Sequence, residues 1–207
     1  MSDNLVSLVK RGNPRAFHDA LRRLLDADKP VSLEAATFSE LTLTGFDFSD
    51  VDLTHAAFEN CTLSECRFVN TNLEGAFFDT TTILHTHFES GNLQDMAIDA
   101  STIGSCTFKE VALEGNEWTD TRLNDCVLEE IASETWWMER VTFKGGRWRQ
   151  VDITGGTWSH VTLREISLQE VVLEGLEITH CYHAEASLHG ADWPQGFIEK
   201  GGRRKAL

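Results

Sequence analysis

A large apolar residue occupies every fifth position of this chain, without a break in register, from Leu33 to Trp193. Of the 33 positions in this series, 31 carry Leu, Ile, Met, Phe or Trp, and the two exceptions are Ser133 and His183. A period of five matches neither the α-helix, whose period is 3.6 residues, nor the β-strand, whose period is two. A short repeat kept over most of a chain is typical of a solenoid, so we expect a solenoid here.

A second repeat position supports this prediction. Two residues before each large apolar residue the chain prefers a small or β-branched residue, as at Ala56, Ala76, Val111 and Val151, and all five cysteines fall in this series. The other three positions of each five are mostly polar. Each pentad therefore turns two side chains inward and three outward, and four pentads close a roughly square coil. About eight coils stacked by strand pairing, at about 4.8 Å each, predict an all-β rod roughly 40 Å long.

Several pentads match the consensus Ala-(Asp/Asn)-Leu-X-X of the pentapeptide-repeat family. They are Val51-Asp52-Leu53, Thr71-Asn72-Leu73, Gly91-Asn92-Leu93, Val151-Asp152-Ile153 and Ala191-Asp192-Trp193. The chain resembles this family over residues 31–193, and the resemblance implies a right-handed quadrilateral β-helix. The small position is often Thr, Val or Cys instead of Ala, and Leu alternates with Phe or Trp at the centre. We expect this alternation to stack aromatic rings from coil to coil on alternate faces.

The ends of the chain do not follow the repeat, which predicts three segments: a helical cap at 1–30, the β-helix at 31–198 and a short basic tail at 199–207. Asn13 followed by Pro14 is typical of a helix start. Phe17, Leu21 and the leucines at 24 and 25 follow at helical spacing, and residues 26–30 end the helix before a proline. A shorter helix is expected over residues 4–11. The cap covers the open end of the first coil; the alternative is that its helices bind a partner.

One segment keeps the register but changes its content. Ser133 replaces a core apolar residue, and Trp136 occupies a position that elsewhere is small. Trp137 then faces outward. Trp136 and Trp137 are therefore candidate partner-binding residues, because tryptophan is enriched in interface hot spots. The alternative is local repacking, in which Trp136 fills the space left at Ser133.

The net charge of −15 is unevenly distributed. Residues 31–140 carry four basic and 21 acidic residues, a net charge of −17, whereas residues 141–207 carry eight of each. Along the predicted rod this is about one net negative charge per 1.6 Å, close to the value of about 1.7 Å for duplex DNA. The excess either serves solubility or binds a basic surface.

Residues twenty apart should stack in columns, and many of the acidic residues fall into three of them. The first column contains Glu34, Glu74, Glu114, Glu134 and Glu174; the second contains Glu59, Asp79, Asp99, Glu139 and Glu199; the third contains Asp50, Glu110, Glu130 and Glu170. Like charges at strand spacing repel each other and cost stability. The candidate partner-binding residues are the first four of the first column and the first four of the second: Glu34, Glu74, Glu114, Glu134, Glu59, Asp79, Asp99 and Glu139.

Motifs that carry chemistry are missing from the sequence. It has no Walker loop, no Gly-x-Gly-x-x-Gly, no His-Glu-x-x-His and no Gly-x-Ser-x-Gly. We therefore expect no enzyme activity, no cofactor and no metal. The five cysteines contain no Cys-x-x-Cys and predict buried thiols in a reducing compartment. With no signal peptide and no apolar run of about eighteen residues, we expect a cytoplasmic protein that does not bind membranes.

These observations favour a non-catalytic scaffold for protein–protein interaction, acting through the faces of the rod. The alternative is implied by resemblance to the acidic, quinolone-resistance members of the family, which act as DNA mimics. It predicts binding to a type II topoisomerase, DNA gyrase or topoisomerase IV, with protection from quinolones or toxins. Direct binding of nucleic acid is not expected, because it would need a basic stripe. Both a monomer and a homodimer are compatible with the sequence.

Overall fold

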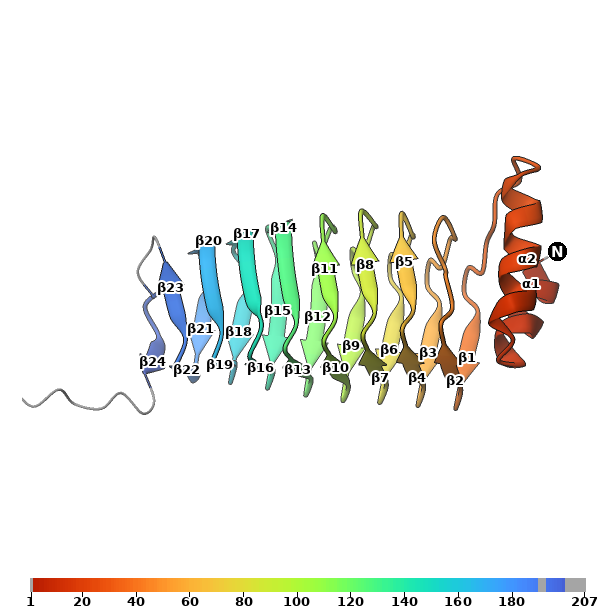
Figure 1. Ribbon diagram of the computed structural model, residues 1–207. Helices are drawn as coiled ribbons and strands as arrows, with labels where there is room; N and C mark the ends of the chain where they lie inside the picture. The colour runs from red at the N-terminus through yellow and green to blue at the C-terminus, as the bar shows by residue number, and fades with distance from the viewer. Residues whose placement is uncertain (1, 190–192, 200–207) are drawn as a thin grey trace, which may run out of the picture.

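The computed structural model describes residues 2–189 and 193–199. It shows a rod of parallel strands with two short helices packed on its N-terminal end (Figure 1). Strands that neighbour each other in a sheet are three apart in chain order over most of the rod, because each coil contributes one strand to each sheet. Paired residues are twenty apart, as in Phe58 opposite Phe78. The predicted fold is confirmed: this is a parallel β-solenoid of about eight turns.

Three sheets run along the rod, and most of their strands are only three residues long. The eight-stranded sheet contains β1 (Thr37–Ser39), β3 (Ala57–Glu59), β6 (Phe77–Asp79), β9 (Ala97–Asp99), β12 (Asn116–Thr119), β15 (Trp136–Glu139), β18 (Thr157–Ser159) and β21 (Glu177–Thr179). The nine-stranded sheet contains β2 (Thr42–Thr44), β4 (Thr62–Ser64), β7 (Thr82–Leu84), β10 (Thr102–Gly104), β13 (Arg122–Asn124), β16 (Thr142–Lys144), β19 (Thr162–Arg164), β22 (Cys181–Ala184) and β24 (Phe197–Glu199). The seven-stranded sheet contains β5 (Arg67–Val69), β8 (His87–Glu89), β11 (Thr107–Lys109), β14 (Val127–Ser133), β17 (Arg147–Thr154), β20 (Ser167–Glu174) and β23 (Ser187–His189).

The pentad produces this shape through its corner residue. In the third coil Phe78 and Ala76 are fully buried, whereas the flanking residues of the strand are only partly buried. Two residues after the buried centre the backbone turns with positive φ, as at Asn60 (φ 52°) and Gly75 (φ 63°). This left-handed conformation is costly for most residues and suits Gly, Asn and Asp. The corner amide is nevertheless satisfied, since the N–H of Asn60 donates to the carbonyl of Asp79 in the next coil at 2.9 Å.

Aromatic rings stack from coil to coil in the core, as the sequence predicts. The Phe58 and Phe78 rings lie 4.8 Å apart at an interplanar angle of 4°. On the seven-stranded sheet the Phe88 ring is 4.9 Å from Phe68 and 4.7 Å from Phe108. These separations equal one strand spacing, so the ladder of backbone hydrogen bonds and the ring stacks reinforce each other.

The fourth side of the rod changes along its length. In the first coils it is a β-turn, in which the Ala56 N–H donates to the Leu53 carbonyl at 2.9 Å, and neighbouring coils are joined by single bridges such as Asp52 with Asn72. In β14, β17 and β20 the strands of the seven-stranded sheet continue around this side. The change falls at Ser133, where the sequence pattern is irregular, and the twenty-residue register continues through it with Ser133 opposite Ile153.

Two helices, α1 (Ser2–Lys10) and α2 (Pro14–Leu25), form the N-terminal cap. The predicted helix start is confirmed, because the Asn13 side chain accepts a hydrogen bond from the Ala16 N–H at 3.0 Å. Phe17 is fully buried and packs 5.5 Å from the Phe46 ring. His18 Nε2 accepts a hydrogen bond from the Asp47 N–H at 2.8 Å. Among the described residues, neither helix has the length and apolar content that crossing a bilayer requires.

All five cysteines are buried and unpaired. Burial raises the pKa of Cys66 and of Cys126 to about 11, and that of Cys106 to about 12. Their thiols donate to carbonyl groups of the coil below, as Cys61 Sγ does to the Phe38 carbonyl at 3.3 Å. They therefore act as small core residues with hydrogen-bonding capacity.

The end of the rod departs from the predicted register. Phe197 pairs with Cys181, so Glu199 lies opposite His183 and not above Thr179. The prediction that Glu199 belongs to the column of Glu59 and Asp79 is therefore wrong. Pro194 lacks a backbone N–H and begins a turn in which its carbonyl accepts from the Phe197 N–H at 3.3 Å, and this turn shortens the last coil. Apart from Glu199, the basic tail predicted at 199–207 lies outside the described residues.

Candidate partner-binding surface

Three carboxylates of the second acidic column stack directly on one another. Glu59 on β3, Asp79 on β6 and Asp99 on β9 are register partners on the outer surface of the eight-stranded sheet. We call these three residues the acidic ladder. Neighbouring members are separated by one strand spacing, about 4.8 Å. Ser39 Oγ donates to Glu59 at 3.0 Å and Thr80 Oγ1 donates to Asp79 at 3.0 Å, but no cation of the described residues pairs with the ladder.

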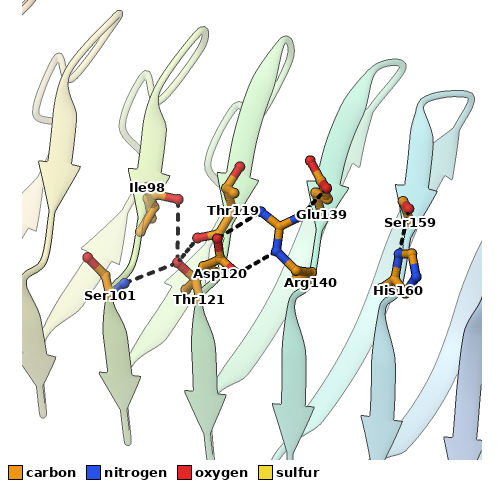
Figure 2. A network of polar contacts seen from close by, with 9 residues as sticks. All are labelled: Ile98, Ser101, Thr119, Asp120, Thr121, Glu139, Arg140, Ser159 and His160. Carbon is orange, nitrogen blue, oxygen red and sulfur yellow. Dashed lines mark hydrogen bonds and ion pairs between the residues drawn. The ribbon is translucent and has the colours of Figure 1, made fainter.

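Glu139, the fourth residue predicted for this column, has a different environment (Figure 2). Thr119 separates it from Asp99 in the register. Its carboxylate forms an ion pair with Arg140, whose guanidinium also binds Asp120 through two hydrogen bonds of 2.6 and 2.8 Å. The hydrogen bond from Arg140 lowers the pKa of Asp120. The unpaired negative charge of this column therefore ends at Asp99.

The first predicted column lies on the neighbouring fourth side of the rod, and its carboxylates are less exposed to one another. Glu74 lies between Thr54 and Gln94, and accepts a hydrogen bond from Asn92 Nδ2 at 3.1 Å. Glu114 and Glu134 do stack, and Glu114 accepts hydrogen bonds from the Glu134 N–H at 3.0 Å and Thr135 Oγ1 at 2.8 Å. Glu34, in the first coil, is followed in this column by Thr54 and therefore stacks on no other carboxylate. This column supplies dispersed charge beside the ladder.

The third column is mostly paired. Asp50 accepts from Asn70 Nδ2 at 3.3 Å, and Glu110 accepts from Ser90 Oγ at 3.3 Å. Lys109 Nζ lies 3.1 Å from Glu110 and lowers the pKa of that carboxyl group. Arg149 contacts Glu130 at 3.6 Å. Neutral donors and cations therefore interrupt this column.

The two tryptophans predicted as a candidate site lie on opposite sides of β15. Trp136 is fully buried, and its ring lies 4.8 Å from that of Trp118. Its Nε1 has no hydrogen-bond partner. Trp137 is 39% exposed and lies beside Glu117 on the same sheet as the acidic ladder. Trp137 can therefore contact a partner directly, whereas Trp136 can only support the surface from below.

Positive charge shows an arrangement that the sequence analysis missed. Arg122, Lys144 and Arg164 all face outward on the nine-stranded sheet, and Lys144 and Arg164 are register partners. The same twenty-residue columns that revealed the acidic ladder, applied to Lys and Arg, would have placed these two side by side. Within the described residues, no three His, Cys, Asp or Glu side chains are grouped so as to hold a metal ion.

Comparisons with known proteins agree with the architecture. The family model "Pentapeptide repeats (8 copies)" matches this chain at residues 32–68 and 47–83. The solved structure of QnrB1, a plasmid-mediated fluoroquinolone resistance protein, aligns with 83% of this chain and 92% of its own, at 18% identity and a TM-score of 0.46. HetL, a pentapeptide-repeat protein of the cyanobacterium Nostoc, aligns with 82% of this chain and 98% of its own, at 15% identity and a TM-score of 0.30. The receptor-binding domain of the siphovirus 9NA tailspike aligns with 86% of this chain and 46% of its own, at 8% identity and a TM-score of 0.51. No curated protein matches in sequence.

The fold and the repeat define a solenoid protein built from pentads. The family match covers residues 32–83, and the same five-residue register runs from Leu33 to Trp193, so pentapeptide repeats build the rod. Proteins of this family are generally structural or interaction proteins.

Proposed function

We propose that this protein is a non-catalytic interaction scaffold whose acidic ladder binds a basic surface of a partner protein. The observation that carries this proposal is that Glu59, Asp79 and Asp99 stack at strand spacing with no cation of the described residues beside them. Like charges in this position destabilise the fold. A basic partner would relieve that repulsion, so binding and the placement of the carboxylates are explained together.

The surroundings of the ladder fit such a contact. Glu74 and Glu114 on the neighbouring side extend the negative potential, which steers a basic partner towards the rod. Trp137 lies further along the same sheet and is the large aromatic side chain best exposed for an apolar anchor. Between β9 of the ladder and β15 of Trp137 lies the single strand β12, which pairs with both, so the two features share one continuous sheet.

Affinity capture with two matched variants tests this proposal. The ladder variant E59Q/D79N/D99N removes three carboxylates from the eight-stranded sheet. The control E165Q/E170Q/E185Q removes three exposed and unpaired carboxylates elsewhere on the rod, so the net charge is the same. A partner that binds the wild type and the control but not the ladder variant supports the proposal. Equal capture by all three proteins contradicts it.

A second candidate is that the basic surface belongs to a type II topoisomerase, with the rod acting as a DNA mimic. The observation favouring it is the row of three carboxylates in the acidic ladder, spaced at about 4.8 Å, where phosphates along one DNA strand are spaced at about 3.4 Å. Supercoiling assays with gyrase and topoisomerase IV should then show inhibition, or protection from a fluoroquinolone, that weakens as salt rises. The ladder variant should lose the effect and the control should keep it. No effect of the wild type at any salt contradicts this candidate.

A further inference from the structure

From β2 to β22, the nine-stranded sheet carries no carboxylate on its outward strand positions. From β2 to β22 the outward residues of the nine-stranded sheet are Thr42, Thr44, Thr62, Ser64, Thr82, Leu84, Thr102, Gly104, Arg122, Asn124, Thr142, Lys144, Thr162, Arg164, Tyr182 and Ala184. We call this set the threonine face. In a chain of net charge −15, such a side is where two copies could meet without bringing carboxylates together.

Three arginines elsewhere on the solenoid form ion pairs across neighbouring coils, and the cations of the threonine face do not. Arg67 pairs with Asp47, Arg140 with Asp120 and Arg149 with Glu129, in each case a carboxylate twenty residues earlier in the coil below. Arg122 and Lys144 instead stack above Thr102 and Asn124, and Arg164 stacks above Lys144. None of these three has an ion pair among the described residues. Stacking Lys144 on Arg164 costs stability, which an external negative charge would offset.

The charge distribution along the rod selects the orientation of a second copy. Residues 31–140 hold a net charge of −17, whereas residues 141–207 are neutral overall and include Lys144 and Arg164. Two parallel copies would place their acidic halves side by side. Two antiparallel copies place the acidic half of each beside the cation-bearing half of the other, and bring the exposed corner residue Glu65 near those cations.

We propose that two copies of this chain associate side by side and antiparallel through the threonine face. The arrangement has two-fold symmetry, so it closes as a dimer and does not extend into a filament. It uses a different side of the rod from the acidic ladder, which stays open in the dimer, and it does not depend on the proposed function.

The size of the face sets the expected strength. Eight strands at about 4.8 Å and strands of three residues at about 3.3 Å give a footprint of about 400 Å² per copy. The total, about 800 Å² before the corner residues are added, is below the roughly 1,200 Å² of a stable specific complex. The dimer should therefore be weak, form at high protein concentration, and dissociate as salt screens its charges.

Sedimentation equilibrium of the full chain at low and high salt tests the proposal. The variant T82E/T102E places two carboxylates on the threonine face, and the control T107E/S167E makes the same change of charge on outward positions of the seven-stranded sheet, where neither residue stacks on a carboxylate. We expect a dimer for the wild type and the control, and at least tenfold weaker association for T82E/T102E. K144E/R164E should weaken the dimer in the same way, which keeps the test valid if T82E/T102E does not fold. A wild type that stays monomeric overturns the proposal, and so does a dimer that neither variant weakens.

Cross-linking tests the orientation. The native thiols are buried, so single cysteines introduced as Thr62→Cys and Thr162→Cys on β4 and β19 would be the reactive ones. If the two copies are antiparallel and centred on the threonine face, a short bismaleimide should cross-link a mixture of the two variants much faster than either variant alone. Faster cross-linking of each variant with itself indicates a parallel pair and overturns the antiparallel arrangement.

Discussion

Replacing Phe78 with alanine tests the inward orientation that the pentad assigns to its centre. Phe78 is fully buried on β6, and its ring lies 4.8 Å from the Phe58 ring at an angle of 4°. A Phe→Ala change at such a position removes the apolar contacts and leaves a cavity, which costs about 3–5 kcal/mol. That is a large part of the total stability expected for a domain, about 5–15 kcal/mol.

The neighbouring Phe77 is a matched control, since it lies on the same strand but points outward and is only partly buried. Phe77→Ala should cost under about 1 kcal/mol, as surface substitutions usually do. Urea unfolding followed by circular dichroism gives both free energies. Tryptophan fluorescence, from residues at 118 and beyond, reports the C-terminal half separately, and a solenoid couples its coils mainly to their neighbours. If Phe78→Ala destabilises the protein no more than Phe77→Ala, the assignment of inward and outward positions is refuted.

Four further predictions concern backbone conformation, thiol reactivity and acid stability. Gly156→Ala should lower the free energy of unfolding by about 1–3 kcal/mol, because its φ is +98° and a Cβ would lie 2.5 Å from the Trp136 carbonyl oxygen; thermal melts check this. Thr80→Gly should raise the free energy of unfolding by about 1 kcal/mol, because Thr80 is a β-branched residue in the left-handed region at φ 50°. An unchanged urea midpoint would contradict this. The five buried thiols should not react with Ellman's reagent at pH 8 until the protein is unfolded. Asp120→Asn should make the melting temperature fall less steeply below pH 4. The pKa of the Asp120 carboxyl group is lowered in the folded state, so its contribution to stability is present above the unfolded pKa and is lost as the pH falls through the folded pKa.

The thiol prediction depends on the direction of the pKa shifts. Burial raises these pKa values in the folded state, to about 11 for Cys66, so the folded protein keeps neutral thiols where the unfolded chain would ionise near pH 8.5. Their contribution to stability is present below the unfolded pKa and declines as pH rises towards 11. Rapid reaction of a thiol in the native protein would show that its coil opens or that the thiol is exposed.

Much of the fold could be predicted because one period fixes several levels of structure at once. The five-residue register determines which side chains point inward, and twenty residues per coil determine which of them stack. The Phe58–Phe78 stack and the Asn13 helix cap both follow from these rules and from local capping chemistry. The last coil could not be predicted in the same way, because the turn at Pro194 shortens it and moves Glu199 opposite His183.

The sequence predicted which acidic residues stack in columns, but not which of them form ion pairs. The sequence placed Glu59, Asp79, Asp99 and Glu139 together, and the register agrees for all four. It could not show that Arg140 neutralises Glu139, because that pairing depends on side-chain geometry across a corner of the rod. Counting negative charge alone also concealed the threonine face, whose defining property is a shortage of carboxylates on one side.

The measurement that tests the central claim most directly is zero-length cross-linking of the scaffold to its captured partner. A carbodiimide activates carboxylates and couples them to lysine amines in contact with them, and peptide mapping then locates the bonds. The account predicts cross-links from Glu59, Asp79 and Asp99 to a basic surface of the partner, which decrease at high salt. Cross-links confined to Glu165, Glu170 and Glu185, or equal binding by the E59Q/D79N/D99N variant, would contradict it.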